Sequence, residues 1–243
     1  MLDYQRISFG LLTPKGFHDF DNVVEVMKLW HTLSPDSFPD RWGAYEPLTR
    51  ELTNKNIESL RDDWGIIAFF KRTKPPKLAA SFTIREPFQE SETFSLITAT
   101  AEVWPSLAES IAEFISAACA STGAVFGYVH RVNQAEVELG QKTWTVSKGH
   151  FVGSKYHYLS IFSQHLEKGL PNLYWLTALG APYIEAMGAS TIDSCPAYKK
   201  TWLREDLVVI QLSKSIDDSL NDESNFEILR ERVKTHLGLY LFQ

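Results

Sequence analysis

LPNLYWLTALGAPYIEAMGASTIDSCPAYKKTWLREDLVVIQLSK, residues 170–214, is the most informative segment of this 243-residue chain. Pro182 suits the first turn of a helix, where its missing N–H is not needed. Gly188 suits the left-handed position that ends a helix, so the residues between them predict a short helix with strand-like segments on both sides. No grouping of side chains in this segment is suited to catalysis. We therefore interpret it as a rigid scaffold or a docking surface, with Tyr183 inserted into the core.

After this short helix the pattern predicts a strand pair and a final helix. Residues 197–203 and 207–212 alternate as strands, and the charged residues 204–206 form their turn. A helix over 224–237 is expected, with Ser224 and Glu227 as its capping box and Gly238 after its end. The apolar residues 239–242 are expected to pack on the sheet.

The N-terminal half predicts a similar mixture of helices and strands. Apolar residues recur with helical spacing over 19–33 and 107–120, and a weaker polar helix is expected over 48–61. The strand predictions of this half are 4–12, 64–71, 78–85, 94–103 and 124–132. Residues 133–169 are left without a firm assignment, although 143–147 and 156–162 have strand-like patterns.

These elements predict an α+β fold, with mainly antiparallel sheet covered by about three main helices, because hairpins outnumber βαβ units. Two organisations stay open. Residues 1–243 form either one α+β domain or two similar subdomains, about 1–135 and 136–243.

Composition excludes several classes of protein. A net charge of −6 argues against binding to a nucleic-acid backbone, which favours a basic surface. Cys119 and Cys195 are the two cysteines, which is typical of a reducing compartment. No signal peptide and no apolar run of membrane-spanning length are visible, so we expect a cytoplasmic protein with no membrane partner.

Metal and cofactor sites find little support in the sequence. None of the seven histidines lies in an H-E-x-x-H motif, or near a cysteine at ligand spacing. His150 and His157 lie in the same unassigned region and are the best metal candidates, but hydrogen-bonded or solvated histidines are the stronger interpretation. We predict no metal, no cofactor and no nucleotide, since glycine-rich phosphate-binding motifs are absent as well.

The nucleophile motifs of hydrolases are also absent, so we expect that the chain is not an enzyme. No G-x-S-x-G motif surrounds a serine. The alternative is a small cysteine/histidine hydrolase in which Cys195 is activated by His150 or His157. Hydrogen-bonding distance to either histidine, together with exposure of the thiol, would support that alternative.

Asp217, Asp218, Asp222 and Glu223 form the densest group of carboxylates. The simpler interpretation is a solvated loop whose aspartates cap the last helix. The functional interpretation is a partner-binding acidic patch, because complementary potentials steer association with a basic protein.

Trp175, Gly180, Tyr183 and Gly188 form the pattern W-x4-G-x2-Y-x4-G, followed by Pro196 and the apolar strand that ends at Gln211-Leu212. This pattern resembles the bacterial immunity proteins of polymorphic-toxin systems, and most of all the immunity protein 52 family. The resemblance covers about forty residues, and no motif of the N-terminal half contributes to it.

The resemblance implies an immunity protein that binds and neutralises a cognate toxin, a nuclease related to restriction endonucleases and delivered by a type VI secretion system. An acidic inhibitor would mimic the phosphates for which a nuclease surface is built. A structural or adaptor protein without a toxin partner is the other binding-protein hypothesis. The sequence does not indicate the oligomeric state.

Overall fold

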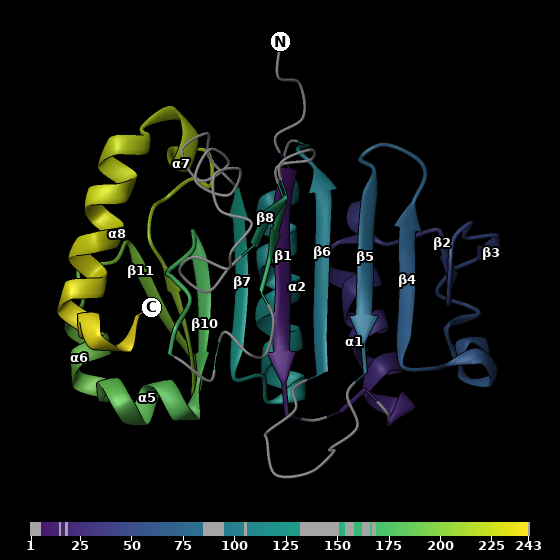
Figure 1. Cartoon of the computed structure of the whole chain (residues 1–243), viewed down its shortest axis with the longest axis horizontal. Coiled ribbons are helices and arrows are strands. Elements are labelled where there is room, and N and C mark those ends of the chain that lie inside the picture. The colour runs from purple at the N-terminus through teal and green to yellow at the C-terminus, as the bar shows by residue number, and fades with distance from the viewer. Residues whose placement is uncertain are drawn as a thin grey trace.

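The computed structural model describes residues 6–14, 16–17, 19–84, 95–104, 106–131, 151–153, 158–161, 166 and 169–242. Its centre is a ten-stranded sheet with the order β11-β12-β10-β7-β1-β6-β5-β4-β2-β3 (Figure 1). The strands are β1 (Arg6–Thr13), β2 (Arg41–Gly43), β3 (Arg50–Glu51), β4 (Ile67–Arg72), β5 (Leu78–Thr83), β6 (Ser95–Glu102), β7 (Phe126–Arg131), β10 (Leu176–Gly180), β11 (Lys199–Arg204) and β12 (Leu207–Gln211). A separate pair joins β8 (Phe151–Gly153) to β9 (Tyr158–Ser160).

Every pairing of the large sheet is antiparallel, as the sequence predicts. β1 lies in the middle, with Phe9 opposite Ala99 of β6 on one side and Val129 of β7 on the other. The antiparallel pair β7–β10 then joins the strands of the N-terminal half to those of the C-terminal half. The sheet is therefore continuous across both halves of the sequence.

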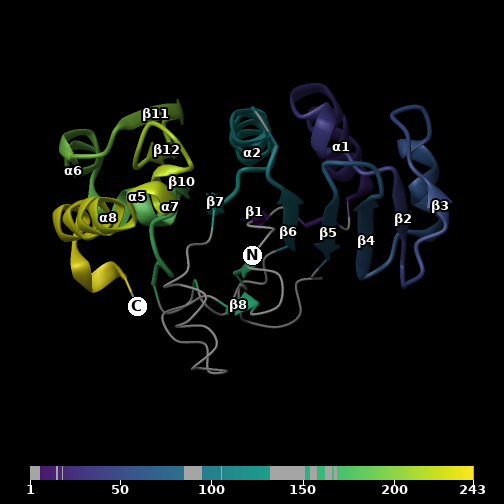
Figure 2. The same cartoon turned by 90° about the horizontal axis from the view of Figure 1, so that it is seen from above.

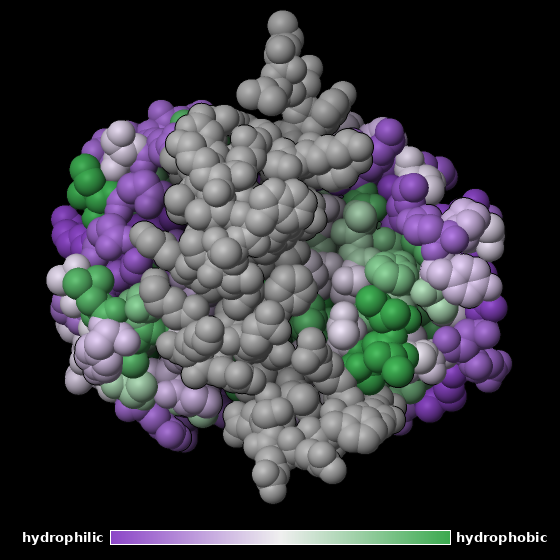
Figure 3. All heavy atoms as spheres, in the orientation of Figure 1, coloured by the Kyte–Doolittle hydropathy of each residue, from purple (hydrophilic) through white to green (hydrophobic). Residues whose placement is uncertain are grey.

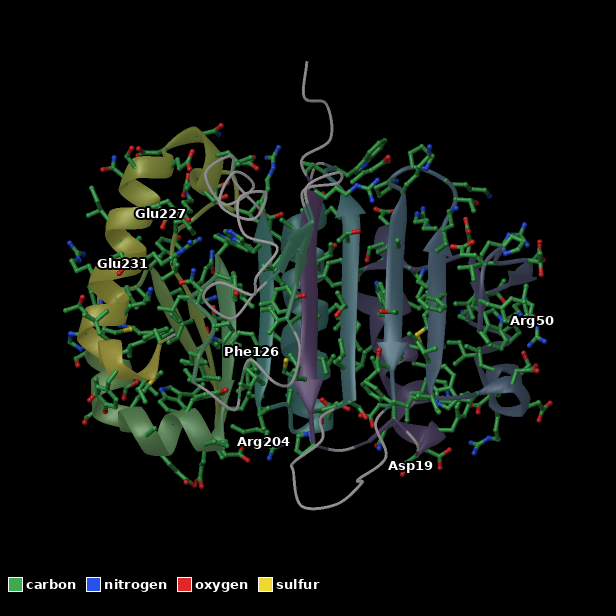
Figure 4. The ribbon with its side chains drawn as sticks, viewed as in Figure 1. Asp19, Arg50, Phe126, Arg204, Glu227 and Glu231 are labelled. Atoms are coloured by element: carbon green, nitrogen blue, oxygen red, sulfur yellow. The ribbon has the colours of Figure 1, made fainter. Side chains whose placement is uncertain are left out.

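Two long helices cover one face of this sheet, α1 (Phe20–Leu33) and α2 (Leu107–Thr122) (Figure 2). Asp19 caps α1, because its carboxylate accepts the N–H of Asp21 at 3.1 Å (Figure 4). An aromatic cluster fills the space beneath the helices. Trp30 lies at its centre, fully buried, stacked 4.9 Å from Phe114 and donating its indole N–H to Ser37 Oγ at 2.7 Å.

The opposite face of the C-terminal half is covered by α8. Gly127 of β7 faces α2, since a Cβ there would lie 2.5 Å from Cys119 Sγ, so the alternating residue His130 points the other way. Phe226 of α8 (Glu223–Leu237) stacks on His130 with ring centroids 6.0 Å apart. The C-terminal 3-10 helix η4 (Leu239–Leu241) follows α8, and a bridge joins Phe242 to Leu170, which lies outside the strands of the sheet. The prediction that residues 239–242 pack on the sheet is therefore wrong for Leu239 and Tyr240, which are exposed.

The prediction of about three main helices is wrong in number. The three predicted helices are present as α1, α2 and α8, but the described residues also form α5 (Ala181–Met187), α6 (Ala189–Ser194) and α7 (Asp218–Asn221). α6 follows directly because Gly188, at φ +82°, turns the chain between two helices instead of releasing it into a loop.

Two local predictions also differ from the structure. The expected helix over 48–61 is replaced by β3 and the 3-10 helix η2 (Ile57–Asp63), since its apolar residues Leu52, Ile57 and Leu60 lack a continuous helical stripe. A second 3-10 helix, η1 (Pro35–Ser37), follows α1. At α8 the cap position is Asp222, one residue before the helix, so Ser224 lies inside the first turn and forms no capping box. The strand-like residues 143–147 lie outside the described residues.

Candidate partner-binding surfaces

The acidic cluster predicted from the sequence lies where α7 meets α8, and part of it is used inside the fold. Asp217 forms an ion pair with Arg131 of β7, whose side chain is only 17% exposed. The Asp218 carboxylate accepts the N–H of Ser215 at 3.1 Å. These two residues therefore fix the loop before α7 to the end of β7, in addition to any contribution to the surface charge.

The other two members of the cluster are nearer to solvent. Asp222 is exposed, and its two carboxylate oxygens lie 2.9 and 2.8 Å from Asn225 Nδ2. Glu223 is half-buried in the first turn of α8, where a negative charge suits the positive end of the helix dipole. The hydrogen bonds from Asn225 and the helix dipole explain these two positions without a partner, so binding by this cluster stays a prediction.

Further acidic residues along α8 are paired with basic neighbours. Glu227 lies 3.1 Å from Arg230, and Glu231 lies 2.8 Å from Lys234 (Figure 4). The acidic character of this helix is consequently concentrated at its N-terminal end and does not extend along its length.

The residues of the W-x4-G-x2-Y-x4-G pattern have structural positions. Trp175 is 2% exposed and donates its indole N–H to the Ser213 carbonyl at 3.0 Å. Gly180 ends β10 against the β7 strand start, where a Cβ would lie 2.6 Å from the Ala124 carbonyl oxygen and 2.8 Å from Val125 Cα. Neither contact can be relieved by a side-chain rotation, because both atoms belong to the backbone.

Tyr183 differs in part from its prediction. The ring packs edge-on against Phe126, with centroids 6.5 Å apart, and burial raises the pKa of its hydroxyl above the ordinary value. The Tyr183 side chain is nevertheless only half-buried. It packs against the core from α5 and is not enclosed in it. The pattern thus marks the β10–α5–α6 corner.

The described residues give no support to a catalytic site. Cys195 is 1% exposed, and burial raises the pKa of its thiol, which is unfavourable for a nucleophile. Its proposed partners His150 and His157 lie outside the described residues. Within the described part of the chain, no group of three or more His, Cys, Asp or Glu side chains could hold a metal ion.

A groove of about 600 Å³ lies beside α2 on the helix-covered face, where β10, β12 and β11 continue past the helix. Its apolar lining residues are Leu33, Ala112, Ala117, Ala120, Trp175, Leu176, Leu203 and Val209. Seen from above, α1 lies on one side of α2, and on the other side the sheet rises toward β11 (Figure 2). Among the described residues, no helix covers these three strands on this face.

Charged residues of opposite sign line the two walls of this groove. Glu109 and Glu113 lie one turn apart on α2, and Lys199 and Lys214 lie on the sheet side. All four are exposed, and none of them forms an ion pair with another described residue. Sequence reasoning missed this site because its walls come from separate segments, residues 109–120 and 175–214, and no motif joins the two.

A second apolar surface lies on the other face of the sheet, over β4 and β5 (Figure 3). Ile67 of β4 is 36% exposed there, and a shallow depression lined by Phe69, Ala79 and Ser81 extends across the neighbouring strands. Its charged lining residues are Arg6, Glu46 and Lys71, which form no consistent arrangement of charge.

No family model and no curated protein sequence matches this chain. Its structure is similar to that of the T6SS protein PA0821 of Pseudomonas aeruginosa, with a TM-score of 0.59 and 11% sequence identity. The match covers 94% of this chain and 77% of that chain. At this identity the likeness shows a shared fold, and the resemblance to the immunity protein 52 family is carried by the sequence pattern alone.

Among the described residues, no helix combines the length and the apolar character needed to cross a bilayer.

Proposed function

We propose that this chain is an immunity protein, which binds a cognate secreted bacterial toxin in the producing cell and neutralises it. The observation that carries the proposal is the fold shared with a T6SS protein over 94% of the chain. The W-x4-G-x2-Y-x4-G pattern supports the same class of protein from the sequence.

The proposed action is binding rather than catalysis. The buried Cys195 offers no accessible nucleophile, whereas the molecule presents a charged groove and an exposed apolar sheet surface that a protein could cover. For the toxin we propose a nuclease, since the chain has a net charge of −6 and nuclease surfaces that hold phosphates are basic.

Co-expression tests this function directly. The toxin candidate is the protein encoded beside this chain, produced from an inducible promoter in a bacterial host with and without this chain. We expect survival only with this chain, and a complex of the two proteins on size-exclusion chromatography. Unchanged killing, together with separate elution of the two proteins, would refute the proposal and favour an adaptor with another partner.

A further inference from the structure

We infer that the groove beside α2 is the docking site for an amphipathic helix of the toxin, an inference that rests on the proposed function. The helix would present large apolar side chains to the groove. Its flank beside α2 would carry Lys or Arg, and its flank beside β11 would carry Asp or Glu.

The packing of the sheet indicates which kind of element belongs here. In the N-terminal half, α1 runs beside α2 and covers the sheet, with Trp30 stacked on Phe114 of α2 and on Phe82 of β5. On the other flank of α2, Leu176, Val209 and Leu203 line the groove from β10, β12 and β11. Leu176 and Val209 are buried at the bottom of the groove and Leu203 is half-buried, and no second helix lies beside α2 on this flank among the described residues (Figure 2). A helix supplied by a partner would complete the layer as α1 does.

The length of the groove suits a short helix. Its α2 wall runs from Glu109 to Ala120, which is roughly 16 Å of helix at 1.5 Å per residue. Near the Ala120 end, the guanidinium of Arg204 donates to the Ala120 carbonyl at 3.0 Å and joins β11 to the end of α2 (Figure 4). Apolar residues at i, i+3 or i+4, i+7 and i+11 of a partner helix would span this length, because eleven residues rise by about 16 Å.

The small residues of α2 allow close approach. Ala112, Ser116, Ala117 and Ala120 line the helix side of the groove, so a second helix could lie near the 8–10 Å axis separation of packed helices. Large side chains from the partner would then fill the space above Leu176 and Val209.

Charge selects the orientation of the helix. Glu109 and Glu113 are exposed on one wall, and Lys199 and Lys214 are exposed on the other wall. None of the four forms an ion pair with another described residue. A helix with basic residues on one flank and acidic residues on the other pairs with both walls in one orientation and opposes both in the reverse one.

Binding of the full-length toxin, inactivated in its own active site, tests the inference by isothermal titration calorimetry. Ala117→Trp fills the groove, and Ala186→Trp on the exposed face of α5 is the matched control. We expect a dissociation constant at least 10-fold weaker for A117W and unchanged for A186W. Circular dichroism and urea unfolding of each variant establish that the fold is retained.

Charge reversal is the second variant set, and it leaves the packing of the fold untouched. Glu113→Lys and Lys199→Glu should each slow association several-fold at low salt, whereas Glu185→Lys on α5 should not. The docking inference is wrong if the wild type binds the toxin, A117W binds it with the same affinity, and E113K and K199E associate at the wild-type rate. That result would leave the proposed immunity function intact.

Two other outcomes also decide the matter. If the wild-type chain fails to bind the toxin or to protect against it, the proposed function fails and the inference fails with it. If the isolated chain is a dimer that A117W converts to a monomer, the groove holds a second copy of this chain and the toxin helix is overturned.

Discussion

Replacement of Gly180 by alanine should destabilise the protein by about 2–4 kcal/mol. The added Cβ would lie 2.6 Å from the Ala124 carbonyl oxygen and 2.8 Å from Val125 Cα, so β10 must move away from the start of β7. Overpacking of this kind costs about 1–3 kcal/mol. The displacement also weakens the hydrogen bond from the Gly180 N–H to the Val125 carbonyl, 2.9 Å long, which contributes about 1 kcal/mol.

Urea unfolding followed by tryptophan fluorescence measures this loss, because Trp175 is buried five residues before Gly180. Gly65→Ala is the matched control. No atom lies within 4 Å of a Cβ at Gly65, so its replacement should be neutral or stabilising by up to about 1 kcal/mol. Equal unfolding midpoints for G180A and G65A would show that the corner tolerates a side chain and that the close approach does not require glycine.

Three further predictions concern single side chains. Asp217→Asn should lower the free energy of unfolding by about 1 kcal/mol, because it weakens the ion pair with the largely buried Arg131. Asp222→Asn should change this free energy by less than about 0.5 kcal/mol. Equal losses for the two variants in chemical denaturation would contradict the prediction. Tyr183→Ala should cost about 1–2 kcal/mol and Phe126→Ala about 3–5 kcal/mol, because only Phe126 is fully buried; the same assay compares them, and an equal cost would place Tyr183 in the core. Burial raises the pKa of the Cys119 thiol to about 12, above the ~8.5 of a thiol in the unfolded chain. The free energy of unfolding should therefore fall as the pH rises from roughly 9 to 12, and it should fall less steeply for Cys119→Ala. Parallel pH profiles of the two proteins would show that the pKa of Cys119 is not raised.

The sequence alone determined which residues form most helices and strands. Apolar residues at helical spacing predicted 19–33, 107–120 and 224–237, and the observed helices α1, α2 and α8 agree within two residues at each end. Helical and strand periodicities are local properties, so they can be read without tertiary contacts. Pro182 and Gly188 gave α5 for the same reason, since φ preferences act on one residue at a time.

The tertiary structure decided which segments, distant in the sequence, lie next to one another. Residues 48–61 have a weak local preference, and their packing against the sheet edge fixed β3 and η2 in place of a helix. Asp217 looked like one charge of a surface cluster, but its partner Arg131 lies 86 positions earlier in the sequence. The groove is formed from α2 and from β10, β11 and β12, which come much later in the sequence, so its glutamates and lysines come to face one another only after the ten strands pair. No local pattern contains that arrangement, because strand order depends on the packing of the whole chain.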